Sequence, residues 1–249
     1  KINPEVAKHF PFSKPRQYQL ETVSEILEAI NKGYKYIVLE AGTGTGKSAI
    51  AATLAQIFNT SYILTITKQL QDQYLNDFNN LGFKLVKGRS NFKCRKYARD
   101  GISQSCDFGR CVVEGDKCRY SIKNHSNNKI TSKNTCEYYF QKFEAMNSNV
   151  TIANYSYLFL ELNYVSDFSK RDLMICDEAH NIESMIMNQL SLEFTRNDLK
   201  EHVKVNITKE LVNQLSEGDP SEWIESPGRS VPCPQWRQRG RTPGTGRRK

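Results

Sequence analysis

The chain has 249 residues and a formal net charge of +8, and 38% of its residues are hydrophobic. This length is sufficient for one or two domains with a substantial core. No apolar run approaches the roughly 18 residues that a membrane-spanning helix needs, so we expect no association with a membrane of that kind.

The positive charge is concentrated in two segments. Residues 227–249 hold seven basic residues and no acidic one, which leaves 28 basic and 27 acidic residues in 1–226. Within that body, residues 87–136 alone hold 12 basic and 4 acidic residues. A local basic patch is typical of nucleic-acid binding, although a solvated lysine-rich surface has the same composition.

The seven cysteines are an odd number and do not resemble the framework of a small secreted disulfide protein. The chain starts at Lys1 and shows no signal-peptide pattern, so we expect a fragment of a longer protein. We expect it in the cytoplasm, in the host-cell cytoplasm if a phage encodes it, or in the nucleus if the source is eukaryotic. Such a reducing compartment points the cysteines towards metal binding.

Helices and strands alternate in the first 86 residues. Pro11 and Pro15 interrupt any early helix, and apolar residues then share one face of a helix over 17–33. The elements that follow in chain order are a buried strand over 36–39, a helix over 49–58, a strand over 61–65, a helix over 68–81 closed by Gly82, and a short strand over 83–86.

The apolar pattern fails over residues 87–135, where cysteines and charged residues dominate. Such a segment needs a cross-link such as a bound metal, because burial of apolar side chains alone cannot stabilise its fold. The pattern then predicts helices over 136–146 and 182–214 and strands over 150–153 and 172–176. Alternating strands and helices indicate an α/β fold with a mostly parallel sheet covered on both faces.

A phosphate-binding loop is predicted between the strand over 36–39 and the helix over 49–58. Its residues are Ala41, Gly42, Thr43, Gly44, Thr45, Gly46, Lys47 and Ser48. Glycines let backbone N–H groups turn towards an anion, and the helix N-terminus adds partial positive charge. In this pattern Lys47 reaches the β- and γ-phosphates and the Ser48 hydroxyl holds Mg²⁺. The alternative is a glycine-rich turn that binds no ligand.

A second half of the same site is predicted at Asp177-Glu178, directly after the strand over 172–176. Asp177 can hold Mg²⁺ through its waters, and Glu178 can orient and deprotonate an attacking water. Many strands end in solvated carboxylates, so this pair gains its meaning from the phosphate loop on another strand of the same predicted sheet.

These two motifs together resemble superfamily 2 helicases of the Asp-Glu-Ala-His type. Ala41, where the strict loop pattern has glycine, also looks like the helicase version of the loop. Three further stretches make the chain resemble one group within these helicases, the iron–sulfur helicases typified by DinG and XPD. The resemblance covers about residues 10–200. The three stretches are Lys87-Gly88-Arg89-Ser90-Asn91-Phe92-Lys93-Cys94, Cys136-Glu137-Tyr138-Tyr139 and Ile152-Ala153-Asn154-Tyr155-Ser156-Tyr157-Leu158.

The resemblance implies an ATP-dependent DNA helicase that moves 5′→3′ on single-stranded DNA. It implies that Arg16 and Gln19 read the adenine, and that His180 relays the nucleotide state to the DNA-binding side. The alternatives are an ordinary exposed helix residue for Gln19 and a structural cap for His180. Thr67, Gln69 and Gln73 match the positions that meet the DNA backbone, for which hydroxyl and amide groups are suited.

Five cysteines are candidates for a cluster that needs four thiolates. Cys94 and Cys136 match the first and last ligands of the family, and we favour Cys111 and Cys118 as the others, with Cys106 as the alternate. The residues alone leave iron–sulfur and zinc equally open, whereas the resemblance favours [4Fe–4S]. Cys176 is expected in the core, and Cys233 has no assigned partner.

The resemblance also divides the chain. It implies a RecA-like P-loop NTPase domain in two parts, 1–86 and 137–185, with the iron–sulfur module over 87–136 inserted between them. The beginning of a helical arch insertion is expected over 186–226. The Arg-, Pro- and Gly-rich tail over 227–249 is expected to be disordered and non-native.

No second motor domain is recognisable, so we expect weak ATP hydrolysis by the chain itself. The expected partners are single-stranded or forked DNA, bound by a monomer, and DNA repair is the expected process, with replication and a phage process left open. The alternatives are a catalytically inert nucleotide- or DNA-binding module and a zinc-bearing ATPase of another superfamily 2 branch.

Overall fold

The structure, a computed structural model, describes residues 2–113, 118–122 and 129–190. The described elements all belong to one compact unit, Lys1–Ser191. Its helices in chain order are α1 (Pro4–His9), α2 (Gln19–Asn31), α3 (Lys47–Ile57), α4 (Lys68–Asp77), α5 (Arg95–Arg99), α6 (Arg110–Val113), α7 (Glu137–Met146), α8 (Tyr155–Leu160) and α9 (Ile182–Leu190). Within this part of the chain no helix has the length and apolar character needed to cross a membrane.

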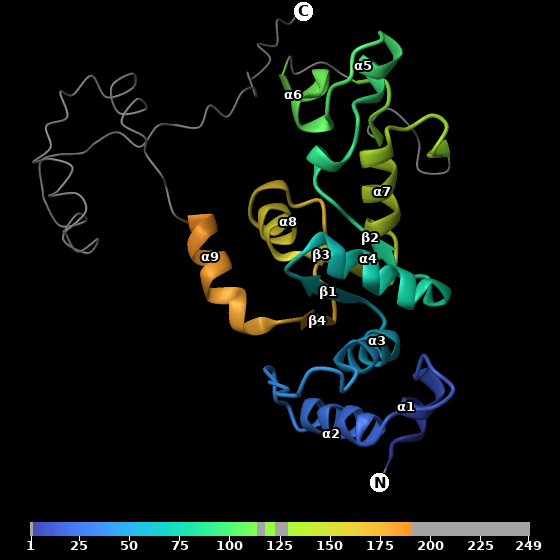
Figure 1. Cartoon of the computed structure of the whole chain (residues 1–249), viewed down its shortest axis with the longest axis vertical. Helices are drawn as coiled ribbons and strands as arrows, with labels where there is room; N and C mark the ends of the chain where they lie inside the picture. Colours follow the sequence, from blue (N-terminus) through green and yellow to red (C-terminus); the bar gives the residue numbers. More distant parts are fainter. Residues whose placement is uncertain (1, 114–117, 123–128, 191–249) are drawn as a thin grey trace, which may run out of the picture. The chain divides into compact units, whose positions relative to one another are not determined.

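A parallel sheet forms the centre of the unit (Figure 1). Its strands are β1 (Ser61–Thr65), β2 (Lys84–Leu85), β3 (Val150–Asn154) and β4 (Leu173–Cys176), in the order β2-β3-β1-β4. All described pairs are parallel, which requires crossover connections of the helix-containing kind. The α/β architecture expected from the alternating pattern is therefore confirmed.

Both faces of the sheet are covered, because side chains of a strand point alternately to its two faces. Ile63 of β1 packs towards α3 and α4, in a cluster with Ala52 and Phe78. Tyr62 and Leu64 point to the other face, in a cluster with residues of α7 and α8 that includes Tyr138, Tyr155 and Leu158. This two-sided burial explains why the central strands are almost continuous apolar runs.

The prediction of a buried strand over 36–39 is wrong. These residues form no strand in the structure, and Tyr36 and Val38 are each 92% exposed. A strand is buried only where neighbouring strands supply hydrogen bonds and helices cover both faces. Among the described residues no strand pairs with this run. The described sheet ends at β4, which has a strand neighbour only in β1.

The remaining predicted elements differ mainly at their ends. The helix over 68–81 is α4 followed by a 3₁₀ turn, Asn79–Leu81, and Gly82 closes it at φ 72°. Helix α1 was not predicted, although Asn3 caps it by accepting from the Glu5 N–H. The parts of the predicted arch and tail beyond residue 190, with Cys233, lie outside the described residues.

Candidate nucleotide site and cysteine cluster

The phosphate loop leads directly into α3. Gly46 is the N-cap of this helix at φ 84°, and Gly44 has φ 80°, conformations that favour glycine. Lys47 Nζ donates to the main-chain oxygen of Ala41 at 3.0 Å, so the lysine lies back across the loop. Thr45 also closes the loop, since its backbone N–H and its hydroxyl both donate to the Gly42 oxygen.

The two residues matched to adenine reading lie against this loop. Gln19 is only 4% exposed, and its amide nitrogen donates to the main-chain oxygens of Thr45 at 3.0 Å and Gly46 at 3.3 Å. The Gln19 amide oxygen accepts from the Arg16 N–H at 2.7 Å, and the Arg16 guanidinium donates to the Gly44 oxygen. The alternative of an ordinary exposed residue at Gln19 is therefore wrong.

Asp177 follows β4 and is held by two main-chain hydrogen bonds. Its N–H donates to the Leu64 oxygen at 2.9 Å, and its own main-chain oxygen accepts from the Tyr155 hydroxyl at 2.8 Å. The next residue, Glu178, has φ 54°, a left-handed conformation that costs a non-glycine residue about 1–3 kcal/mol. Such local strain tends to occur at functional turns.

Ser48 and Asp177 both lie near the Tyr74 hydroxyl, although they are far apart in sequence. The Tyr74 hydroxyl of α4 donates to Asp177 Oδ2 at 3.2 Å, and Ser48 lies within hydrogen-bonding reach of the same hydroxyl. Burial raises the pKa of Asp177, and the Glu178 charge adds to this, whereas the Tyr74 hydrogen bond and the Lys47 charge oppose it. The start of α3 and the end of β4 thus approach each other at Tyr74.

Tyr74 was not identified from the sequence. It is 2% exposed, and burial together with the Asp177 charge raises its pKa, so the hydroxyl remains a donor at neutral pH. Leu70 and Tyr74 lie one helical turn apart on α4, a spacing that indicates an inward face. Because a buried tyrosine hydroxyl usually has a hydrogen-bond partner, this spacing was the available signal.

The other matched residues lie at the surface. Glu178 and His180 contact each other, with 3.4 Å between His180 Nδ1 and Glu178 Oε2. Thr67 caps α4 by accepting from the Leu70 N–H at 3.2 Å. Thr67, Gln69 and Gln73 are all exposed, so their polar groups face solvent from the start of α4.

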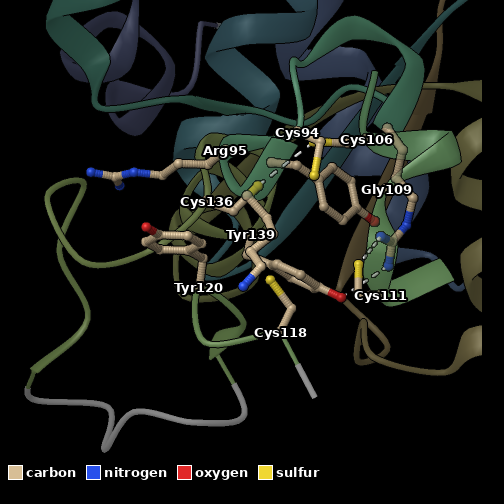
Figure 2. A pocket seen from close by; sticks show the side chains of 12 residues that line it. Cys94, Arg95, Cys106, Gly109, Cys111, Cys118, Tyr120, Cys136 and Tyr139 are labelled. Atoms are coloured by element: carbon tan, nitrogen blue, oxygen red, sulfur yellow. Dashed lines mark hydrogen bonds between the residues drawn. The ribbon is translucent and has the colours of Figure 1, made fainter. Parts of the chain in front are cut away.

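The five candidate cysteines line one small cavity (Figure 2); they are Cys94, Cys106, Cys111, Cys118 and Cys136. The cavity is also lined by basic and aromatic side chains, among them Arg89 and Tyr139. Arg89 contacts Cys111 Sγ at 3.7 Å and donates to the Tyr139 hydroxyl at 3.1 Å. Cys176, in contrast, lies in β4 and packs against the main core, as expected.

Main-chain and sulfur contacts bring Cys106 close to Cys94 and to Cys136. The N–H groups of Cys94 and Cys106 donate to Gln104 and Phe92, so the two segments run side by side. Cys106 Sγ lies 3.7 Å from Cys136 Sγ, and its hydrogen bond lowers the pKa of the Cys136 thiol. A Cβ at Gly109 would stand 3.4 Å from Cys94 Sγ, so glycine permits this close approach.

These donors suit a thiolate-ligated group, because the cavity supplies more than four thiols and a neighbouring positive charge. Within the described ranges, no three Cys, His, Asp or Glu side chains stand close enough together to hold a single metal ion. The cysteines therefore share one cavity without forming a metal site among the described residues.

Comparison with known proteins supports the assignment of the fold. Residues 12–208 match the family described as "Type III restriction enzyme, res subunit". A probable ATP-dependent helicase of Methanocaldococcus jannaschii is 28% identical over 88% of this chain and 37% of its own length. The ATP-dependent DNA helicase YoaA of Escherichia coli is 29% identical over 72% of this chain and 35% of its own length.

A solved structure titled "Truncated XPD" aligns with a TM-score of 0.47 and 16% identity, over 78% of this chain and 64% of that one. The chain spans little more than a third of the length of the two curated relatives above. The family match covers well over half of the chain. The chain therefore belongs to the family described by the type III restriction enzyme res subunit, and its resemblance to superfamily 2 helicases of the DinG and XPD type is confirmed.

Proposed function

We propose that the chain forms a nucleotide-binding motor domain of an ATP-dependent DNA helicase that moves 5′→3′ on single-stranded DNA. The observation that carries this proposal is the approach of Ser48 and Asp177 to the Tyr74 hydroxyl, together with the Lys47 charge that acts on Asp177. A phosphate loop and a strand-end carboxylate at one place are what phosphoryl transfer from a nucleotide requires.

In this proposal the loop from Ala41 to Ser48 holds the phosphates through its N–H groups and the start of α3. Lys47 binds the β- and γ-phosphates, while Ser48 and Asp177 hold Mg²⁺. The metal would neutralise charge on the phosphate oxygens. Arg16 and Gln19 bind the adenine, and their contacts with the loop support a place beside the same nucleotide.

Glu178 orients and deprotonates the attacking water in this proposal, and His180 relays the nucleotide state to the DNA-binding side. Their support is their position directly after Asp177 and their contact with each other. Both side chains are more than a third exposed, which leaves them accessible to a substrate and to other parts of a longer protein.

Single-stranded or forked DNA is the proposed partner. The exposed side chains at the start of α4, Thr67, Gln69 and Gln73, would contact its phosphates without reading sequence. The basic insert over 87–136 would add charge attraction. We place the protein, as a monomer, in the cytoplasm and in DNA repair, in line with the expectations from its sequence.

For the cysteine cavity we propose a [4Fe–4S] cluster held by Cys94, Cys111, Cys118 and Cys136, with Cys106 as the alternate ligand and zinc as the alternative metal. The support is electrostatic proximity. Burial raises the pKa of the Cys118 thiol, and the charges of Cys111, Cys136 and Cys94 add to this effect. The same four cysteines therefore influence one another across the cavity. Such a group would hold the insert over 87–136 together, since its mostly polar residues cannot build a core.

We further propose that the motor domain comprises 1–86 and 137–185, that an arch begins over 186–226, and that 227–249 is a non-native tail. A second motor domain would then belong to the longer protein. This predicts weak ATP hydrolysis by the 249-residue chain even with DNA present; robust DNA-stimulated turnover by this chain would contradict it.

Nucleotide binding by the chain tests the proposal directly. Calorimetric titration with a non-hydrolysable ATP analogue and Mg²⁺ should show binding, and Lys47→Ala should weaken it by about tenfold or more, since a charge-assisted phosphate contact contributes about 1.5–3 kcal/mol. Lys68→Ala, which removes an exposed lysine at the start of α4 and outside the loop, is the matched control and should bind as the parent does. Equal affinity of Lys47→Ala and the parent would contradict the proposed site.

A further inference from the structure

We propose that Tyr74 is a positioning residue that orients Asp177 for Mg²⁺. This inference rests on the proposed function, because it assigns the metal to Asp177 and Ser48. The geometry points to it: the buried Tyr74 hydroxyl donates to Asp177 Oδ2 at the end of β4, and Ser48 of α3 lies near the same hydroxyl.

The position of the hydroxyl is fixed by the packing of its ring. Tyr74 lies in the core cluster between the sheet and α4, together with Ile63 and Phe83. Its ring centroid is 5.8 Å from that of Phe78, the C-cap of α4. Close-packed interiors hold such rings in one rotamer, so the oxygen remains at the point where the phosphate loop and the strand end meet.

A tyrosine hydroxyl can accept one hydrogen bond and donate another. Donation to Asp177 Oδ2 at 3.2 Å fixes one carboxylate oxygen and leaves the other for the cation. Ser48 is close enough to act on the same hydroxyl, so the expected ligand from α3 lies near the carboxylate that Tyr74 orients. Partners of this kind, which contact the ligands and not the metal, typically change metal affinity by about 10–100-fold when removed.

The experiment compares Tyr74→Phe with the parent 249-residue chain. The affinity for a fluorescent non-hydrolysable ATP analogue is measured with Mg²⁺ and, separately, with a chelator. The parent should bind more tightly with Mg²⁺, and Tyr74→Phe should lose about tenfold of that metal-dependent gain. Its affinity in the chelator should equal that of the parent, which also shows that the variant is folded.

Tyr62→Phe is the matched control. Tyr62 is equally buried at 2% exposure, and its hydroxyl donates to the Ser169 main-chain oxygen at 2.7 Å, away from the metal pair. This variant removes one buried hydroxyl and one hydrogen bond, as Tyr74→Phe does, and should keep the full Mg²⁺ gain. A similar loss of metal dependence in both variants would overturn the assignment.

Three results separate failure of this inference from failure of the proposed function. If the parent gains no affinity from Mg²⁺, the proposed metal–nucleotide site is itself wrong. If the parent gains affinity and Tyr74→Phe gains as much, only the role of Tyr74 is wrong. If Tyr74→Phe loses affinity equally with Mg²⁺ and in the chelator, the tyrosine supports nucleotide binding in general and not the metal, which would overturn the inference.

Discussion

Lys142 of α7 forms a hydrogen-bonded ion pair with Glu161, at 2.6 Å between Nζ and Oε1, and both side chains are almost completely buried. Asp167 completes a triad with the same ammonium at 2.8 Å. Since α7 begins directly after Cys136, and Glu161 directly follows α8, this triad connects the end of the cysteine insert to the sheet unit. Because these side chains are charged and Lys142 and Glu161 are buried, the ammonium and the Glu161 carboxylate stabilise the fold only when both are present.

Removal of one partner should therefore be costly. Lys142→Met keeps most of the side-chain volume but leaves the Glu161 carboxylate buried without its cation. We expect a loss of about 3 kcal/mol in the free energy of unfolding, measured with chemical denaturant. Lys84→Met is the matched control, because Lys84 pairs with Glu144 at 3.0 Å near the surface and should contribute less than about 1 kcal/mol. Equal effects of the two substitutions would contradict a special role for the triad.

The contribution of Lys142 to the free energy of unfolding should persist at neutral pH and disappear only in alkaline solution. Burial alone lowers the pKa of this lysine, but hydrogen bonds to Asp167 and Glu161 raise it above the ordinary value. A raised lysine pKa stabilises the fold fully below the unfolded-state pKa of about 10.4, and the contribution is lost as pH rises through the folded value. The stability difference between the parent and Lys142→Met should therefore be constant from about pH 6 to 9 and decrease above about pH 10. A difference that vanishes near neutral pH would contradict this.

Asp177 should behave in the opposite way, as a residue that serves binding at some cost to stability. Burial raises its pKa, so the ionised carboxylate is disfavoured in the folded chain. The penalty is complete above the raised pKa and is relieved as pH falls towards the ordinary aspartate pKa of about 3.9. Without nucleotide, Asp177→Asn should therefore melt at a higher temperature than the parent at neutral pH, with a smaller difference in acid, while its Mg²⁺-dependent binding is lost. A lower melting temperature at neutral pH would contradict the prediction.

Local patterns were sufficient to predict most of the sheet, and the nucleotide site beside it stays a prediction. Strands β1, β3 and β4 are short apolar runs bounded by polar residues, and such runs have few alternatives inside an α/β domain. The rule that carboxyl ends of parallel strands share one edge does not apply to the loop near residue 47, because no described strand precedes it. The loop leads instead into α3, which packs against β1 and β4.

The errors concern features that distant residues decide. The run over 36–39 is as apolar as β1, but a strand also needs neighbours, and no local pattern shows whether they are present. Helical spacing indicates that Tyr74 points inward, yet its partner Asp177 is 103 positions away in the chain. Likewise, spacing leaves Cys106 as a mere alternate, whereas folding places its sulfur against that of Cys136.

The position of Cys106 leads to a test of the ligand set. If Cys94, Cys111, Cys118 and Cys136 hold a [4Fe–4S] cluster, anaerobically purified Cys111→Ser should lose most of its iron, sulfide and visible absorption. Cys106→Ser should keep about four irons per chain, as the parent does. The reverse result would assign Cys106 as the ligand in place of Cys111, and stoichiometric zinc in the parent would exclude an iron–sulfur cluster.

Gly46 offers a test of how Arg16 and Gln19 brace the phosphate loop. A Cβ at this position would stand 2.2 Å from the Gln19 amide nitrogen, and the backbone has φ 84°. Gly82 has a similar φ of 72° with nothing within 4 Å of the added Cβ, so Gly82→Ala measures the backbone strain alone, about 1–2 kcal/mol. We expect Gly46→Ala to cost more than Gly82→Ala in denaturant unfolding and also to weaken nucleotide binding. Adding Gln19→Ala should recover part of the lost stability, because it removes the clashing amide. Equal costs for the two glycines would show that Gln19 moves away freely and does not brace the loop.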